Sequence, residues 1–236
     1  MATNLVMLPV ADGTTMAAYA AVPTGQGPFP GLLLFQEAFG VNHHIRELAE
    51  RFAREGWITV APELFHRTAA PGFEGSYTDF STVAPHMQAL TEKGLSDDVR
   101  AAAAWLHQQP QLRADAIAAI GYCLGGRVSF LANSLLPLKA AVSYYGGRIA
   151  PDLVKRAPQL SGHQLFFWGG RDQHIPPEQI SAVLAGLQQA GKPYTNVVIS
   201  DADHGFFCDE RASFNPAAAR DAWALTIAFL RGRVAA

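Results

Sequence analysis

Apolar residues along this chain occur in short unbroken runs that alternate with segments of helical spacing. The runs cover residues 31–35, 57–61, 116–121, 140–145, 164–168 and 194–199. Between them, apolar side chains recur every three or four residues in 45–55, 97–108, 125–133, 176–190 and 216–230. Continuous apolar runs are typical of strands buried on both faces, and amphipathic segments between them are typical of covering helices. The pattern therefore predicts an α/β fold, with a mainly parallel central sheet and helices on both faces.

The start of the chain and one long segment depart from this alternation. Residues 5–9 and 14–22 flank the turn Asp12-Gly13, which predicts an opening hairpin. Residues 62–94 mix proline and glycine with aromatic side chains, which is consistent either with a small cap over the sheet edge or with an irregular connection. We expect Ser96 to cap the helix that follows. No repeat or linker divides the chain, so a single domain over 1–236 is expected.

Composition and charge narrow the class of protein. Apolar residues make up 49% of the 236 residues and charged residues 16%, which excludes a disordered chain. The net charge of −2 offers no basic surface for nucleic acid, and no apolar run approaches the length of a membrane span. The first residues lack the pattern of a signal peptide. We therefore expect a cytoplasmic protein, a monomer or weak homodimer, with neither a nucleic-acid nor a membrane partner.

The cysteine and histidine patterns give no sign of a metal or cofactor. Only two cysteines are present, Cys123 and Cys208, and neither a CxxC pair nor an HExxH helix occurs. Such spacings would be expected of a zinc site. We therefore expect two reduced thiols, no metal and no cofactor.

The strongest chemical signal is Gly121-Tyr122-Cys123-Leu124-Gly125-Gly126, where a predicted strand turns directly into a predicted helix. In the motif G-x-S-x-G the nucleophile occupies a strained strand-to-helix turn, and glycines beside it avoid collisions with neighbouring backbone. A thiol at a helix N-terminus is favoured as the thiolate by the helix dipole and by free N–H groups. Cys123 is therefore the candidate nucleophile. The N–H groups of Leu124 and of Ala38, in the loop after the third strand, are candidate oxyanion donors.

Two further candidates each follow a separate predicted strand. Asp172 comes just past the strand over 164–168, and His204 comes just past the strand over 194–199. Active sites of open α/β sheets form at the carboxyl edge of the strands. The order nucleophile, acid, histidine is the chain order of α/β-hydrolases. We therefore expect His204 to act as the general base and Asp172 to orient it.

These residues lie in a chain that resembles the dienelactone hydrolase family of α/β-hydrolases over nearly its whole length. The resemblance is carried by Gln36-Glu37-Ala38-Phe39-Gly40, Ala61-Pro62-Glu63-Leu64-Phe65, the cysteine elbow and Asp203-His204-Gly205-Phe206. It implies an α/β-hydrolase fold and hydrolysis of a lactone or carboxylic ester through a thioester on Cys123. It also implies that Glu37 reaches the thiol and helps to hold or release its proton before substrate arrives.

The residues expected to bind substrate depart from the family's pattern. The best-known members bind a carboxylate with two arginines, one in the cap region and one soon after the catalytic histidine. Here Arg67 is the only arginine between residues 65 and 94, and Cys208 stands about where the second arginine is expected. Arg211 is a candidate substitute, although an ion pair with Asp209 or Glu210 is the simpler interpretation.

Aromatic residues near the predicted site then suggest a partly apolar pocket for a small-molecule ester or lactone that is neutral or weakly polar. The candidates for this lining are Phe39, Tyr77, Tyr145 and Phe206. Of the other titratable residues, we expect His43 and His44 at the surface or edge of a helix, His174 in a loop, and Glu63 in an ion pair within the cap.

Two other classes of function stay open. A redox-active thiol protein would use Cys123, alone or with Cys208, but it would leave Asp172 and His204 without a purpose. A binding module without catalysis is also consistent with the fold, because a fold does not fix a function. The complete triad favours the hydrolase.

Overall fold

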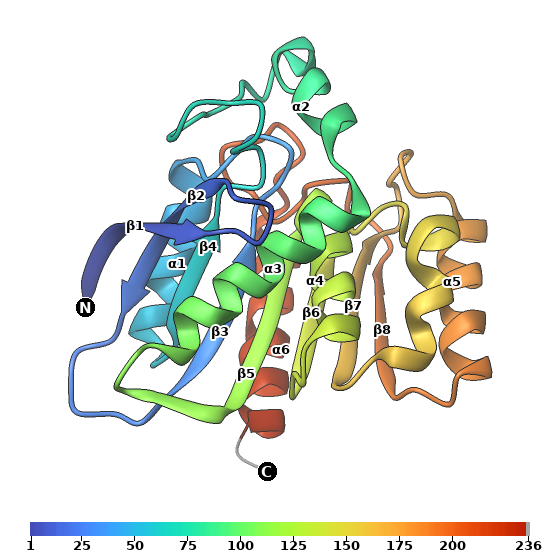
Figure 1. Ribbon diagram of the computed structural model, residues 1–236. Helices are drawn as coiled ribbons and strands as arrows, with labels where there is room; N and C mark the ends of the chain where they lie inside the picture. The colour runs from blue at the N-terminus through green and yellow to red at the C-terminus, as the bar shows by residue number, and fades with distance from the viewer. Residues whose placement is uncertain (235–236) are drawn as a thin grey trace. The chain divides into compact units, whose positions relative to one another are not determined.

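The computed structural model describes residues 1–234 (Figure 1). The chain forms two compact units, Met1–Ile117 and Ala118–Ala236, and strand β5 (Leu112–Tyr122) contains the point where one ends and the other begins. We describe each unit separately. The expectation of a single domain stays a prediction.

The first unit is built on four strands in the order β1-β2-β4-β3. Strands β1 (Ala2–Pro9) and β2 (Thr15–Val22) form the predicted antiparallel hairpin, and the Asp12 carboxylate accepts the Thr14 N–H at 3.0 Å in its turn. Strand β2 continues antiparallel to β4 (Ile58–Pro62), which runs parallel to β3 (Phe29–Phe35). Strands β3 and β4 are the continuous apolar runs, and the residues of β4 are all buried.

Two helices cover the strands of the first unit. In Figure 1, α3 (Glu92–His107) lies in front of these strands and α1 (His43–Arg54) lies behind them. The Asn42 side chain caps α1 by accepting the Ile45 N–H at 3.3 Å. The expected cap of α3 is wrong. Thr91 caps this helix by accepting the Gly94 N–H at 3.0 Å, so Ser96 lies inside the helix and donates its hydroxyl to the Glu92 carbonyl.

The segment over 62–94 contains short helices and its own apolar packing. Helical turns η1 (Phe80–Thr82) and α2 (Ala84–Ala89) precede α3, and α2 stands above the strands of this unit in Figure 1. A small apolar cluster joins this segment to the loop after β3. It contains Ala38, Phe39, Phe73, Tyr77, Val83 and Met87. The segment is therefore packed against the loop that carries Ala38. Its role as a cap stays a prediction.

The second unit is built on strands that all run parallel. The end of β5 pairs with β6 (Ala140–Tyr144), β6 pairs with β7 (His163–Gly169), and β7 pairs with β8 (Tyr194–Ile199). The predicted parallel arrangement is confirmed here. Because the strands are parallel, their carboxyl ends lie at one edge of the sheet.

Helices cover both faces of the parallel strands in the second unit. Figure 1 shows α4 (Leu124–Leu135) in front of β6 and α6 (Pro216–Val234) behind it. The Tyr144 and Thr226 hydroxyls lie 2.6 Å apart and join β6 to α6. Helix α5 (Pro177–Gln189) follows β7, as predicted. The sequence analysis missed two short helical segments, η2 (Ile149–Leu153) and η3 (Val154–Gln159).

No helix within residues 1–234 combines the length and the apolar character that crossing a membrane would require.

Candidate active site

The strand-to-helix turn at Cys123 has the geometry of a nucleophile elbow. Cys123 directly follows β5, caps α4 and has φ 52° and ψ −112°, a backbone conformation that a side chain other than glycine rarely adopts. A Cβ atom at Gly121 would collide with the backbone of Gly125, and a Cβ atom at Gly126 would lie 2.7 Å from the Tyr144 carbonyl oxygen. The glycines are therefore required by close backbone approach. They allow Cys123 to stand at the sheet edge, partly exposed.

The second unit joins the three predicted catalytic side chains in one hydrogen-bonded chain. His204 Nε2 lies 3.1 Å from Cys123 Sγ, and His204 Nδ1 lies 2.7 Å from Asp172 Oδ2. Cys123 follows β5, Asp172 follows β7 and His204 follows β8, so all three stand at the carboxyl edge of the parallel strands. An ionised Asp172 can only accept, so Nδ1 carries a proton and Nε2 faces the thiol. The predicted arrangement of these three residues is found.

The protonation of His204 depends on its two partners. Burial alone would lower the pKa of His204, but the charge of Cys123 and the hydrogen bonds to Asp172 and Cys123 outweigh it and raise this pKa to about 10. At neutral pH His204 is therefore favoured as the imidazolium.

Further groups of the second unit contact Asp172 and His204. The His174 N–H donates to Asp172 Oδ1 at 2.8 Å, so each oxygen of the carboxylate accepts a separate hydrogen bond. The His204 ring is also flanked by two other rings. Its centroid lies 5.0 Å from that of Tyr145 and 5.1 Å from that of His174. We expected His174 only as a loop residue, and its spacing of two from Asp172 was the one available signal of its role.

Comparison with known proteins gives the family of this chain. The profile of the Dienelactone hydrolase family matches residues 16–233 and so extends over both units. The chain belongs to the dienelactone hydrolase family. A Synechocystis sp. protein named "Putative carboxymethylenebutenolidase" is 36% identical over 233 residues, which are 94% of this chain and 93% of that protein.

Solved structures of similar sequence have the same fold. The crystal structure of a "Putative Dienelactone Hydrolase" from Klebsiella pneumoniae has 31% sequence identity and a TM-score of 0.86, and the match covers 97% of this chain and 98% of that chain. A dienelactone hydrolase-like promiscuous phosphotriesterase from metagenomic libraries is 22% identical with a TM-score of 0.84 over 99% of both chains, and it shares the fold. The family confirms two predictions, the α/β-hydrolase fold and the class of ester or lactone hydrolases.

Three other residues of the second unit were predicted to take part, one as an oxyanion donor and two as pocket lining. Leu124 is the first residue of α4, where helical N–H groups lack partners within the helix. Tyr145 and Phe206 are fully buried and their ring centroids lie 5.4 Å apart. Their service as a pocket lining stays a prediction.

Arg211 lies beside the loop that carries His204. Gly205 has φ +78°, and its missing Cβ leaves the space that the Arg211 guanidinium occupies. Glycine is thus required at this position both by backbone conformation and by close approach. This arrangement places the Arg211 guanidinium beside the residue that follows His204. The choice between substrate binding and an ion pair with Asp209 or Glu210 stays open.

The predicted residues of the first unit are held by contacts within that unit. Glu37 is buried, and the preceding Gln36 side chain donates to the Glu37 carbonyl at 3.2 Å and accepts the Leu64 N–H at 3.0 Å. Phe39 and Tyr77 pack edge to face with centroids 4.6 Å apart. The roles of Glu37 and Ala38 in the reaction, and of Phe39 and Tyr77 in binding substrate, stay predictions.

Arg67 and His44 of the first unit both have defined surroundings. Arg67 donates to both oxygens of the buried Asp98, at 3.0 and 2.8 Å, and to Asp12 Oδ2 at 2.7 Å. Its guanidinium therefore has acidic partners already. The absence of the family's anion-binding pair from this chain stays a prediction. The expectation for His44 is wrong, because this histidine is buried on the inner face of α1.

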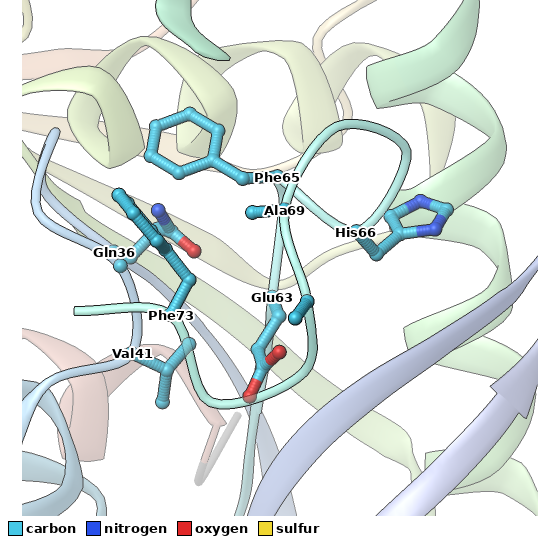
Figure 2. Close-up of a pocket in the computed structure, with 9 residues that line it drawn as sticks. Gln36, Val41, Glu63, Phe65, His66, Ala69 and Phe73 are labelled. Carbon is cyan, nitrogen blue, oxygen red and sulfur yellow. The ribbon is translucent and has the colours of Figure 1, made fainter. Parts of the chain in front are cut away.

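A small pocket of the first unit surrounds the start of the 62–94 segment (Figure 2). Glu63 accepts the Gly72 N–H at 3.0 Å, in place of the ion pair that we expected within the cap. In Figure 2 its carboxylate and the His66 ring point in different directions. The pocket has room for a water molecule only. It is lined by Gln36, Gly40, Val41, Glu63, Phe65, His66, Ala69, Ala70 and Phe73.

Replacing Glu63 with glutamine is expected to flatten the fall in stability with rising pH. Burial raises the pKa of Glu63, although the Gly72 N–H opposes this change. The native state therefore retains a proton that the unfolded chain releases, and its stability falls as pH rises from the ordinary carboxyl pKa through the raised value. Glutamine keeps an oxygen for Gly72 and cannot ionise. We expect a gain of about 1 kcal/mol or less near neutral pH.

Urea unfolding of wild type and Glu63→Gln across the acidic to neutral range measures this effect. The exposed Glu178 of α5 provides the matched control, because Glu178→Gln makes the same chemical change without burial. Equal pH slopes for wild type and Glu63→Gln would contradict the prediction.

Proposed function

We propose that this chain hydrolyses carboxylic esters or lactones by forming a thioester on Cys123. The observation that carries the proposal is the continuous hydrogen-bonded chain from Cys123 Sγ through His204 to Asp172 Oδ2, at 3.1 and 2.7 Å. A nucleophile, a base and an orienting acid within hydrogen-bond reach are the geometry that covalent catalysis requires.

The first half of the reaction forms the acyl-enzyme. The Cys123 thiolate attacks the carbonyl carbon of the substrate, and the carbonyl π electrons move to oxygen to give a tetrahedral oxyanion. Backbone N–H groups stabilise this charge, and we assign them to Leu124, directly after the nucleophile, and to Ala38, in the loop after the third strand. Each such donor is worth about 3–4 kcal/mol. The oxyanion then collapses, the C–O bond to the alkoxide breaks, and His204 Nε2–H gives the leaving oxygen its proton.

The second half of the reaction returns the free enzyme. His204 Nε2, now neutral, removes a proton from a water molecule as the water attacks the thioester carbonyl. A second tetrahedral oxyanion forms and collapses with departure of the Cys123 thiolate, which restores the thiolate and imidazolium. The carboxylic acid is released. In a lactone the leaving alcohol stays tethered to the acyl group, so a single hydroxy acid is the product.

For the substrate we propose a small, neutral or weakly polar ester or lactone. Arg67 is the arginine of the cap segment, where the family uses an arginine to bind a carboxylate. Here its guanidinium is already paired with Asp98 and Asp12. The relatives named as carboxymethylenebutenolidases make lactones the first substrates to test. Comparable rates on neutral esters and on carboxylate-bearing lactones would contradict this substrate preference.

Trapping of the acyl group on Cys123 tests the proposed function. Wild type mixed with a p-nitrophenyl ester, quenched in acid during turnover, is expected to gain the mass of one acyl group on the peptide that contains Cys123. Iodoacetamide provides the control, since Cys123 is partly exposed whereas Cys208 is buried. The alkylated protein is expected to form no acyl-enzyme. Hydrolysis that persists after alkylation of Cys123 would overturn the proposal.

A further inference from the structure

The residue after strand β6 has an unusual backbone and a defined position. Tyr145 has φ +37°, which a bulky side chain rarely adopts, and its N–H donates to the Phe167 carbonyl of β7 at 2.7 Å. The next residue is Gly146, where a Cβ atom would lie 2.9 Å from the Arg127 backbone nitrogen in α4. The chain is therefore held between β7 and the start of α4, and the direction of the Tyr145 side chain is fixed.

That side chain packs against the catalytic base. The Tyr145 ring is fully buried, and its centroid lies 5.0 Å from the His204 ring with 58° between the ring planes. Phe206, two residues after His204, lies on the same tyrosine ring at 5.4 Å and 72°. Tyr145 thus contacts the histidine and also the loop that carries it. Backbone strain of this kind persists where the surrounding structure demands one conformation, and it clusters at functional sites.

We propose that Tyr145 is a positioning residue, whose ring keeps His204 in its catalytic orientation while Cys123 carries the acyl group. This inference rests on the proposed function and assigns Tyr145 a role other than substrate binding. In the free enzyme, Asp172 and Cys123 Sγ hold the two nitrogens of His204. In the thioester, Sγ is bonded to the acyl carbon and no longer carries a proton or a negative charge. His204 then keeps the bond to Asp172 and its ring contacts.

The deacylation step should therefore depend on Tyr145 more than the acylation step does. Deacylation requires Nε2 to face a water molecule without the help of the Sγ partner, and small errors in orientation reduce rates strongly. His174 contacts the same imidazole at 5.1 Å but is exposed, so it restrains the ring less than a buried neighbour does. Loss of the Tyr145 ring should make the acyl-enzyme accumulate.

The test compares Tyr145→Leu, which removes the ring, with Tyr145→Phe, which keeps it. Phe166→Leu provides a matched control, because Phe166 is a buried aromatic of β7 whose ring contacts are with Phe130 and Trp168. With a p-nitrophenyl ester, Tyr145→Leu is expected to lower the deacylation rate constant by about tenfold and to raise the acylated fraction at steady state. Tyr145→Phe should keep the wild-type ratio of acylation to deacylation, and Phe166→Leu should keep it as well.

Two results of these ester kinetics would overturn the inference. A rise in KM with an unchanged kcat in Tyr145→Leu would mean that the ring contacts substrate. Equal changes in Tyr145→Leu and Phe166→Leu, in parallel with their melting temperatures, would mean a general packing effect.

Alkylation of Cys123 by iodoacetamide near neutral pH separates this inference from the proposed function. In the free enzyme the Tyr145 ring adds to the contacts of His204 with Asp172 and Sγ, so its loss should have a smaller effect there than in the acyl-enzyme. The positioning role therefore predicts modestly slower alkylation in Tyr145→Leu than in Tyr145→Phe, even where no ester is turned over. If wild type forms no acyl-enzyme but Tyr145→Leu is still alkylated more slowly than Tyr145→Phe, the proposed function is overturned and the positioning role is kept. Unchanged alkylation with unchanged deacylation would overturn the positioning role alone.

Discussion

Replacing Cys123 with alanine is expected to lower kcat/KM for an activated ester by about 10⁴- to 10⁶-fold. In the proposed mechanism the thiol is the group of the hydrogen-bonded chain that forms a covalent bond with the carbonyl carbon. Without it, His204 and Asp172 retain their contact at 2.7 Å but have no nucleophile to activate. Alanine also removes a charge that the imidazolium faces. The measurement is steady-state hydrolysis of a p-nitrophenyl ester by freshly reduced protein.

Cys208→Ala is the matched control for this substitution. Cys208 is also a cysteine outside any disulfide, but it is buried, and the hydrogen bonds that join Cys123, His204 and Asp172 do not involve it. Its loss is expected to change kcat/KM by no more than a few-fold, with a small loss of stability. If the two alanine variants have the same activity as wild type, Cys123 is not the nucleophile. If both lose activity together, a pair of thiols is required, as in the redox alternative.

The hydrogen-bonded arrangement of Cys123, His204 and Asp172 in the second unit was predictable from sequence because parallel strands impose a simple geometry. Each strand ends at the same edge, so residues in the loops that follow β5, β7 and β8 can meet whatever the intervening helices contain. The elbow glycines were predictable for a similar reason. Only a residue without a Cβ atom can stand where the backbones of β5 and α4 approach so closely.

Other features depended on contacts that leave no pattern in the sequence. The start of α3 was placed five residues too late, because Thr91 and Ser96 are both good capping residues and only the Gly94 N–H decides between them. The burial of His44 depends on how α1 is turned against its neighbours. The packing of Tyr145 on His204 depends on a left-handed backbone that the sequence Tyr144-Tyr145-Gly146 does not indicate.

The loop beside Asp172 also contains a contact that leaves no pattern in the sequence. The sequence identified the carboxylate and its partner His204, but the His174 N–H that holds the other oxygen is a backbone group. Backbone donors carry no residue signature, since every residue except proline has one. This donor nevertheless determines which way an amide would face at position 172.

Asp172→Asn is therefore expected to lower kcat/KM by about 10³- to 10⁴-fold with little change in fold. An asparagine has a single acceptor oxygen, and the His174 N–H, 2.8 Å from Oδ1, requires it. The amide NH₂ then faces His204 Nδ1, which must accept and so loses its proton. The remaining proton moves to Nε2 and points at the thiol. A neutral histidine of this tautomer cannot remove a proton from Cys123.

The pH dependence of this variant distinguishes a wrong tautomer from simple misfolding. The bond to Asp172 is one of the interactions that raise the pKa of His204 to about 10, so its loss lowers that pKa and removes the imidazolium partner of the thiolate. Alkylation of Cys123 near neutral pH should slow, and activity should recover partly at alkaline pH, where hydroxide ionises the thiol directly. Asp201→Asn is the control, because it makes the same charge change at an exposed position of the His204 loop. An Asp172→Asn enzyme within tenfold of wild type near neutral pH would mean that the carboxylate does not set the tautomer of His204, and that burial and ring contacts alone hold the base.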